Sequence, residues 1–226
     1  MKAQQEVNNK EIKSKLVYDK LYRKIIYEEI PDETKLVSRH IAIEYGVSEI
    51  PVREALKRLN SEGLIDYIPY RGYVVTNSSL EKLRDLWVIK VNLELFACKL
   101  AVESVNDNDI KRLNDNISMA KDLIQKKEFH KYYRLNKDFH LIFCGICRNT
   151  LMVDMIKNLW VRTEKLRGPY PFSEEEILDS VSEHEEMVKT LETKDVERLE
   201  HLLYKQRDKI WDKYLGMFER RKYLLR

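Results

Sequence analysis

The amino-acid sequence predicts a mainly α-helical protein of two domains, an N-terminal winged helix-turn-helix and a C-terminal antiparallel six-helix bundle. Three observations support this prediction. Only 6 Gly and 5 Pro occur in 226 residues and 35% of the residues are charged, a composition that favours long helices over strand-rich folds. Apolar residues recur with helical spacing along most of the chain. The length also suffices for two domains that each bury a core.

The first two helices are predicted from apolar spacing and from turn residues. Apolar residues with helical spacing occupy 15–27, and Pro31 breaks this pattern. A second, short helix is expected to begin with Ser38 as its N-cap. It ends at Gly46, which tolerates the left-handed geometry of a tight turn.

A third helix and a hairpin complete the first domain. Ser48 is the expected N-cap of this helix, and Pro51 occupies its first turn, where a missing N–H costs nothing. Gly63 ends the helix, and strands are predicted over 64–68 and 73–75. Three helices and a hairpin in this order make a winged helix-turn-helix.

A polar stretch, 77–79, is the expected hinge between a domain at 1–76 and a domain at 80–226. Ser78 and Glu81 have capping-box spacing for the next helix. Short polar joints separate the amphipathic segments beyond the hinge, which predicts an antiparallel bundle. These segments lie near 79–104, 107–127, 128–147, 150–167, 173–192 and 195–218.

Charge, apolar content and cysteines limit the class of protein. The net charge is +3, and residues 1–76 carry 13 Lys and Arg against 12 Asp and Glu, so charge alone does not indicate a nucleic-acid partner. Without a secretory signal or a run of about 18 apolar residues, we expect a soluble, cytoplasmic protein with no membrane partner. Cys98, Cys144 and Cys147 are expected to be reduced, the last two lying in the core on one helix face.

Two parts of the sequence resemble known regulators. The stretch GVSEIPVREAL at 46–56, followed by Leu59, Glu62-Gly63-Leu64 and Arg71-Gly72, resembles the signature of GntR-family regulators. The remainder resembles the FCD-type ligand-sensing domain of the FadR subfamily. The residues that carry this second resemblance are Phe139-His140, Asn149, Glu183-His184 and Asp195.

The resemblance implies a transcriptional regulator and not an enzyme. It implies a homodimer whose recognition helices enter successive major grooves of a palindromic double-stranded operator. A small-molecule effector in the bundle is expected to change the spacing of these helices. We expect a repressor, because a dimer bound at a promoter most simply excludes polymerase.

The N-terminal end of the third helix is the expected DNA-reading element, because that end of a recognition helix faces base edges. Arg53 is expected on a base or phosphate and Lys57 on a phosphate, since both lie on the polar face. Arg71 at the hairpin tip is suited to a minor groove, and Arg39 matches a family position that contacts DNA. The predicted DNA-binding residues are Arg39, Ser48, Glu49, Ile50, Pro51, Arg53, Lys57, Arg71 and Gly72.

Glu49 departs from the family, which usually carries Arg at this position. The change removes a side chain suited to guanine, whereas a carboxylate accepts a hydrogen bond from cytosine N4. We therefore expect an operator that differs at that base from the common family sequence.

The resemblance also implies a site in the centre of the bundle, where many relatives bind a divalent metal through one Asp and three His. His140 and His184 match two of these ligands, but Asn136 stands at the Asp position and Gln206 at the third His. Divalent metals in such sites prefer carboxylate and imidazole donors to neutral amides. We therefore expect no metal, and a retained metal would depend on His140 and His184.

The same positions favour an organic ligand, because Asn, Gln and His offer donors and acceptors inside an apolar bundle. Lys90, where relatives often carry Arg, is expected to attract a carboxylate, so the predicted effector is a small organic acid. A buried hydrogen-bond network without a ligand is the alternative. The predicted effector-binding residues are Lys90, Arg134, Asn136, His140, Arg162, His184 and Gln206.

Other functions remain as alternatives. One is a metal-responsive regulator, or a helical metal-dependent enzyme, that uses His140 and His184. The enzyme has no supporting motif, since the sequence lacks H-E-x-x-H, a Gly-rich phosphate loop and a recognisable nucleophile. Another is a regulator that has lost DNA binding and acts through protein contacts, which Glu49 and the near-neutral first domain favour.

Overall fold

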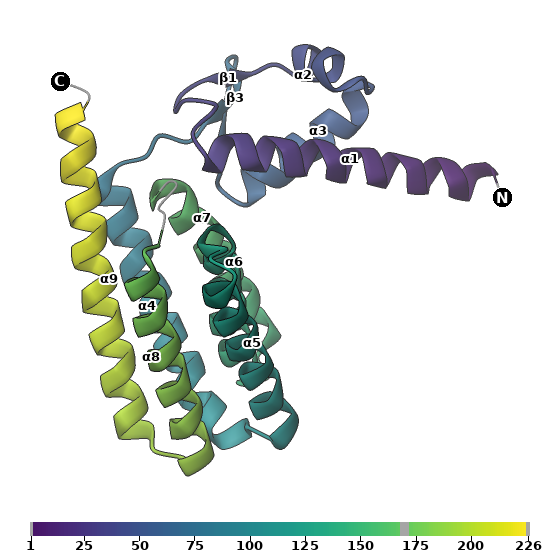
Figure 1. The fold of residues 1–226 in the computed structure, drawn as a ribbon. Helices are drawn as coiled ribbons and strands as arrows, with labels where there is room; N and C mark the ends of the chain where they lie inside the picture. Colours follow the sequence, from purple (N-terminus) through teal and green to yellow (C-terminus); the bar gives the residue numbers. More distant parts are fainter. Residues whose placement is uncertain (1, 168–171, 225–226) are drawn as a thin grey trace. The chain divides into compact units, whose positions relative to one another are not determined.

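The computed structural model describes residues 2–167 and 172–224, with side chains for 11–166 and 172–216. The described chain forms two compact units. The first unit contains the residues up to Leu83 and the end of one long helix from Val161 onward, and the second contains the rest. Helices dominate both units and a small sheet lies in the first (Figure 1), which confirms the predicted fold class.

The first unit is a winged helix-turn-helix. Its strands form one antiparallel sheet in the order β1-β3-β2, with Lys35 opposite Val74 and Tyr67 opposite Tyr73. The core joins apolar side chains from all three helices to Leu64, Ile65 and Val75 of the hairpin. The elements are α1 (Lys2–Ile26), β1 (Lys35–Leu36), α2 (Ser38–Tyr45), α3 (Glu49–Ser61), β2 (Ile65–Ile68) and β3 (Gly72–Val75).

Turn residues set the boundaries of this unit largely as predicted. Gly46 has φ +66° and ends α2, and Gly63 has φ +74° after α3. The N-cap of α2 is Val37, so Ser38 is the first helical residue and its predicted capping role is wrong. Ser48 holds the N-cap position of α3 with extended backbone, but its side chain makes no capping hydrogen bond.

Strand β1 was not predicted, because two residues are too few to show the alternation of apolar and polar side chains that marks a strand. Its burial pattern explains why it forms, since Leu36 packs into the core while Lys35 is exposed. Helix α1 likewise begins at Lys2, well before the apolar periodicity that predicted it.

The predicted cap at the start of the second domain is wrong by one residue. Helix α4 (Leu80–Ser104) begins after Ser79, whose Oγ accepts a hydrogen bond from the backbone N–H of Lys82 at 3.1 Å. The N–H of Ser78 instead donates to Asp32 Oδ2 at 2.7 Å. Ser79 therefore accepts from a backbone N–H of the first turn that has no partner within the helix. Ser78 connects the hinge to the loop after α1 by a hydrogen bond.

The second unit is the helical bundle, whose helices run alongside one another (Figure 1). Helix α5 packs on α6 and α8, and α8 packs on α9. Asn106 and Ser173 form capping boxes at the starts of α5 and α8. The elements after α4 are α5 (Asp107–Gln125), a 3-10 turn η1 (Phe129–Lys131), α6 (Tyr132–Gly145), α7 (Thr150–Arg167), α8 (Glu174–Thr193) and α9 (Val196–Leu224).

All three cysteines are buried free thiols. The prediction that Cys144 and Cys147 share a helix face is wrong, because α6 ends at Gly145 and Cys147 lies in the following turn. Cys144 instead lies beside Cys98 of α4, and their hydrogen bond together with burial raises the pKa of the Cys144 thiol well above its usual value.

Candidate functional site

The exposed face of α3 carries the predicted DNA-contacting side chains. Its opposite face is buried through Val52, Ala55, Leu56 and Leu59, which leaves the polar stripe outside. The side chains of Arg53 and Lys57 are 65% and 66% exposed. Pro51 differs from its neighbours because it is buried in the first turn, where it fits the start of the helix.

Glu49 and Arg53 interact with each other in the structure. Glu49 Oε2 accepts from Arg53 Nη2 at 3.0 Å across one turn of α3, and Glu54 pairs with Lys57 at 3.4 Å. Exposed pairs of this kind are worth about 0.3–0.5 kcal/mol, so they orient the cations without holding them strongly. Glu49 therefore also helps to orient the Arg53 side chain.

The remaining predicted DNA contacts lie on α2 and on the wing, which is the β2–β3 hairpin of residues 65–75. Arg39 is exposed on α2, and Ile50 in the first turn of α3 is 56% exposed. Arg71 is exposed, and its Nη2 donates to the carbonyl of Glu33 at 3.3 Å. Gly72 has φ +86°, which explains a glycine there. One unit thus holds all nine residues, and their contacts with DNA stay a prediction.

Within the second unit, two of the predicted effector-binding residues meet in the interior. The rings of His140 on α6 and His184 on α8 lie 5.2 Å apart, and His184 stacks on Phe139 at 3.7 Å. Burial and the nearby Lys90 ammonium lower the pKa of His140 to about 3. Burial lowers the pKa of His184 well below its usual value. Both imidazoles are neutral, and His184 Nε2 is buried without a hydrogen-bond partner.

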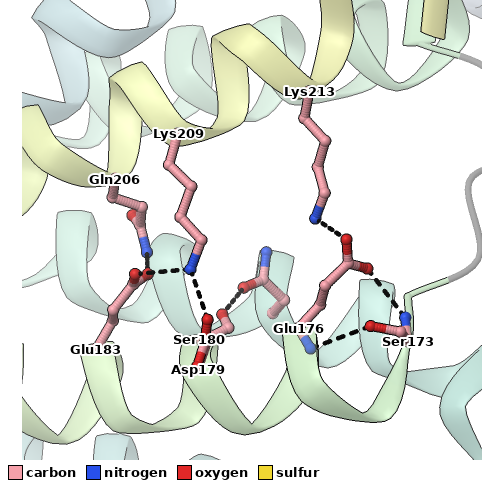
Figure 2. A network of polar contacts seen from close by, with 9 residues as sticks. Ser173, Glu176, Asp179, Ser180, Glu183, Gln206, Lys209 and Lys213 are labelled. Carbon is pink, nitrogen blue, oxygen red and sulfur yellow. Dashed lines mark hydrogen bonds and ion pairs between the residues drawn. The ribbon is translucent and has the colours of Figure 1, made fainter. Parts of the chain in front are cut away.

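The two amides of the predicted site, Asn136 and Gln206, bind residues of α8. Asn136 Oδ1 accepts from the Ser180 hydroxyl at 3.3 Å, and Gln206 Nε2 donates to Glu183 Oε2 at 3.1 Å. Figure 2 shows that Gln206 belongs to a network in which Lys209 binds Asp179 and Glu183, and Lys213 binds Glu176. Sequence reasoning placed Gln206 correctly on the inward side of α9, where it is buried, but missed its carboxylate partner.

Lys90 does not lie free in the bundle. Its Nζ contacts Glu94 Oε2 at 2.7 Å, and both side chains are buried on α4. The indole N–H of Trp160 donates to the other carboxylate oxygen at 2.6 Å. The ammonium lies 3.8 Å from the centroid of the Trp160 ring and 5.0 Å from that of Trp87. Sequence reasoning missed Glu94, although its (i, i+4) spacing from Lys90 on one helix face was a usable signal.

Arg134 and Arg162 are the two remaining residues of the predicted effector site. Arg134 is exposed and lines a surface groove of about 390 Å³ between α5 and α6, together with Met119, Asp122 and Asp138. Arg162 lies on the end of α7 that groups with the first unit. Their predicted roles in effector binding stay predictions.

The donor set does not fit a divalent metal. Asn136 and Gln206 offer neutral amides, and each is engaged by α8. Among the residues that the structure describes, no group of three His, Cys, Asp or Glu side chains is arranged to hold an ion. Two imidazoles alone leave a structural or catalytic metal short of its usual ligands.

Comparison with known proteins decides the family. Residues 13–75 match the model of bacterial regulatory proteins of the gntR family, and residues 85–206 match the FCD domain. The chain belongs to the GntR family and carries an FCD domain. Across the described part of this GntR-family chain, no helix is long and apolar enough to cross a membrane.

Relatives of known name agree with this assignment. The chain is 26% identical over 167 residues to the HTH-type transcriptional repressor RspR of Escherichia coli (strain K12), covering 74% of this chain and 73% of RspR. It is 26% identical over 175 residues to the HTH-type transcriptional regulator McbR of the same organism, covering 75% and 77%. The solved structure of E. coli McbR/YncC has the same fold, with a TM-score of 0.74 at 22% identity over 91% of this chain and 98% of that one. The protein is therefore a transcriptional regulator and not an enzyme.

Proposed function

We propose that this GntR-family regulator represses transcription as a homodimer on a palindromic operator, and that a small molecule bound inside the bundle controls it. The exposed face of α3 supports the proposal of DNA binding, because Arg53 and Lys57 project from it while the opposite face is buried. The similarity to RspR, a transcriptional repressor, supports repression. The protein is expected to act in the cytoplasm, where the DNA is.

Operator choice is proposed to depend on Glu49. In the free protein this carboxylate binds Arg53, so it both occupies a base-facing position and directs the neighbouring guanidinium. A carboxylate accepts from cytosine N4, whereas an Arg at the same place binds guanine O6 and N7. The operator of this protein therefore differs from that of a relative with Arg at this position.

Selection of duplexes from a random pool tests this proposal. Wild type and Glu49→Arg are expected to enrich different bases at one position in each half-site. Glu54→Arg is the matched control, because it makes the same charge change five residues further along α3 and should raise affinity without changing the preferred base. Identical preferred sites for wild type and Glu49→Arg would contradict the role of Glu49. Binding without steep salt dependence would contradict DNA recognition itself.

The interior of the bundle is proposed to hold the effector around His140 and His184. The observation that carries this is the buried, unpartnered Nε2 of His184, because a buried polar atom without a partner costs free energy that a ligand hydrogen bond recovers. A small organic acid remains the proposed ligand class. Its carboxylate has to compete with Glu94 for the Lys90 ammonium.

Thermal shifts of the full chain with a panel of small organic acids, their amides and zinc chloride test the effector site. Stabilisation by an acid that is lost in His184→Asn supports the proposal. His201→Asn is the control, since His201 is exposed on α9. Metal analysis of protein prepared without chelators completes the test. Stoichiometric bound metal, or stabilisation by zinc alone, would overturn an amide-lined organic site.

A further inference from the structure

The ion pair between Lys90 and Glu94 lies in the interior of the second unit. Lys90 is 3% exposed and Glu94 is 9% exposed, and Lys90 Nζ lies 2.7 Å from Glu94 Oε2. Removing two charges from water costs free energy that their attraction only partly returns, so apolar residues of similar size are often at least as stable in such a place. The fold of the bundle therefore does not require this pair, and its presence indicates a role in binding.

The two members of the pair are held differently. Glu94 is fixed from α7, because the indole N–H of Trp160 donates to its Oε1 at 2.6 Å. Lys90 has a long, flexible side chain, and its ammonium lies 3.8 Å from the centroid of Trp160 and 5.0 Å from that of Trp87. Aromatic faces attract a cation without fixing its direction. The pair can therefore open by a movement of Lys90 while Glu94 keeps its place.

His140 connects this pair to the unpartnered histidine. Its ring lies 5.5 Å from that of Trp160 and 5.2 Å from that of His184. Trp160 in turn contacts both Lys90 and Glu94. The ion pair and the buried Nε2 of His184 therefore belong to one polar region of the interior.

The balance of charge in this region limits which ligands fit. Burial lowers the pKa of both imidazoles, and the Lys90 ammonium lowers that of His140 further, so neither histidine supplies a positive charge. A simple acid that takes Lys90 away from Glu94 leaves a buried carboxylate without a cation, which is strongly unfavourable. A simple amine on Glu94 leaves Lys90 in the same state. A ligand with one charge of each sign satisfies both residues and adds no net charge.

We propose that the bundle binds a small amino acid as a zwitterion, with its carboxylate on Lys90 Nζ and its ammonium on Glu94 Oε2. This inference deepens the proposed function and rests on it, since it takes the interior of the bundle as the effector site. Glu94 becomes the residue that selects an amino acid over a simple acid. The aromatic faces of Trp87 and Trp160 beside the pair also favour a ligand ammonium.

Matched compounds test this charge rule on the full wild-type chain. Leucine, isocaproate and isoamylamine share one carbon skeleton and differ only in their charged groups, as do phenylalanine, hydrocinnamate and phenethylamine. Thermal shifts with the protein amino acids identify the one that stabilises most, and calorimetry then compares it with its matched acid and amine. The acid and the amine are expected to bind at least about a hundredfold more weakly, because each leaves one buried charge unpaired.

A double substitution tests the residues. Lys90→Gln with Glu94→Gln removes both charges and keeps an acceptor for the Trp160 N–H, so the protein is expected to melt near the wild-type temperature. It is expected to bind the amino acid about a hundredfold more weakly than wild type. Lys111→Gln with Asp115→Asn is the matched control and should not change binding. That pair has the same (i, i+4) spacing and the same 2.7 Å separation, but it is exposed.

Each outcome decides the inference. An acid or an amine that binds as tightly as its amino acid overturns it, and binding of the acid leaves the proposed effector site intact. Unchanged binding of the amino acid by the double variant also overturns it, because the ligand then lies away from the pair. The wild-type comparison decides even if the double variant does not fold. If neither amino acids nor simple acids change the wild-type melting temperature, the proposed effector site fails together with the inference.

Discussion

The two units carry candidate sites of opposite physical character. The residues proposed to bind DNA lie on an exposed helix face and a hairpin tip, where each side chain depends mostly on its own element. Four of the residues proposed to bind an effector are buried, namely Lys90, His140, His184 and Gln206. Lys90, Asn136 and Gln206 each bind a partner on another turn or another helix. Substitutions of the exposed candidate DNA-binding residues should therefore change binding and leave stability unchanged. Substitutions in the second should change stability first.

The largest effect is expected from removing the charge of Glu94. Glu94→Gln leaves the buried Lys90 ammonium without its carboxylate, so the free energy of unfolding is expected to fall by about 3–5 kcal/mol in urea titrations. Glu103→Gln on the same helix is exposed and should change it by less than about 0.5 kcal/mol. If both variants are equally stable, burial does not make the Glu94 carboxylate more important for stability than an exposed one.

The buried histidines should make the second unit sensitive to acid. Unfolded histidines titrate near pH 6.5, whereas the pKa of His140 in the fold is about 3 and that of His184 is well below its usual value. Between these values the unfolded chain binds protons that the fold excludes, so stability is fully present above pH 6.5 and falls as the pH falls. From pH 7 to pH 5 the loss is expected to be about 2 kcal/mol for His140, and His184 adds a loss in the same direction.

Urea titrations at several pH values measure this effect. Replacing both histidines, as His140→Leu with His184→Leu, is expected to flatten the dependence of stability on pH. His201→Leu is the control, because His201 is exposed and should leave the dependence unchanged. A steep dependence that survives the double substitution would assign the acid sensitivity to other groups.

Substitutions on α3 are expected to have a smaller effect, and to change DNA binding instead of stability. Arg53→Ala should weaken binding to the selected duplex by about 1–3 kcal/mol, while the free energy of unfolding stays within about 0.5 kcal/mol, because Arg53 is exposed. Lys57→Ala should weaken binding to all duplexes by a similar factor, since a phosphate contact is independent of sequence. Loss of stability in either variant would contradict the contrast between the two units.

The smallest effect tests the start of α4. Ser79→Ala is expected to lower the free energy of unfolding by about 1 kcal/mol, because it removes the acceptor for the Lys82 N–H. Ser78→Ala keeps the backbone N–H that donates to Asp32 and should therefore cost less. Thermal melts of the two variants decide between the cap predicted from sequence and the cap in the structure.

Local sequence determined most of the first unit. Gly46, Gly63 and Pro51 define turns and a helix start through their own backbone preferences, and these preferences hold whatever surrounds them. The apolar spacing of α3 also fixed which side chains are exposed, so the candidate DNA contacts could be named in advance. What spacing could not show was β1, because a two-residue strand exists only through its partner β3.

Tertiary structure decided what the polar residues of the second unit do. The sequence identified His184 and Gln206 as inward-facing and Lys90 as a residue of the same site, and all three are buried. It could not show that Glu94 and Trp160 both contact the Lys90 ammonium and bind each other. Nor could it show that Glu183 accepts a hydrogen bond from Gln206, or that His184 Nε2 has no partner. Helical periodicity gives the direction of a side chain, whereas its hydrogen bonds, charge state and availability depend on atoms brought from distant parts of the chain.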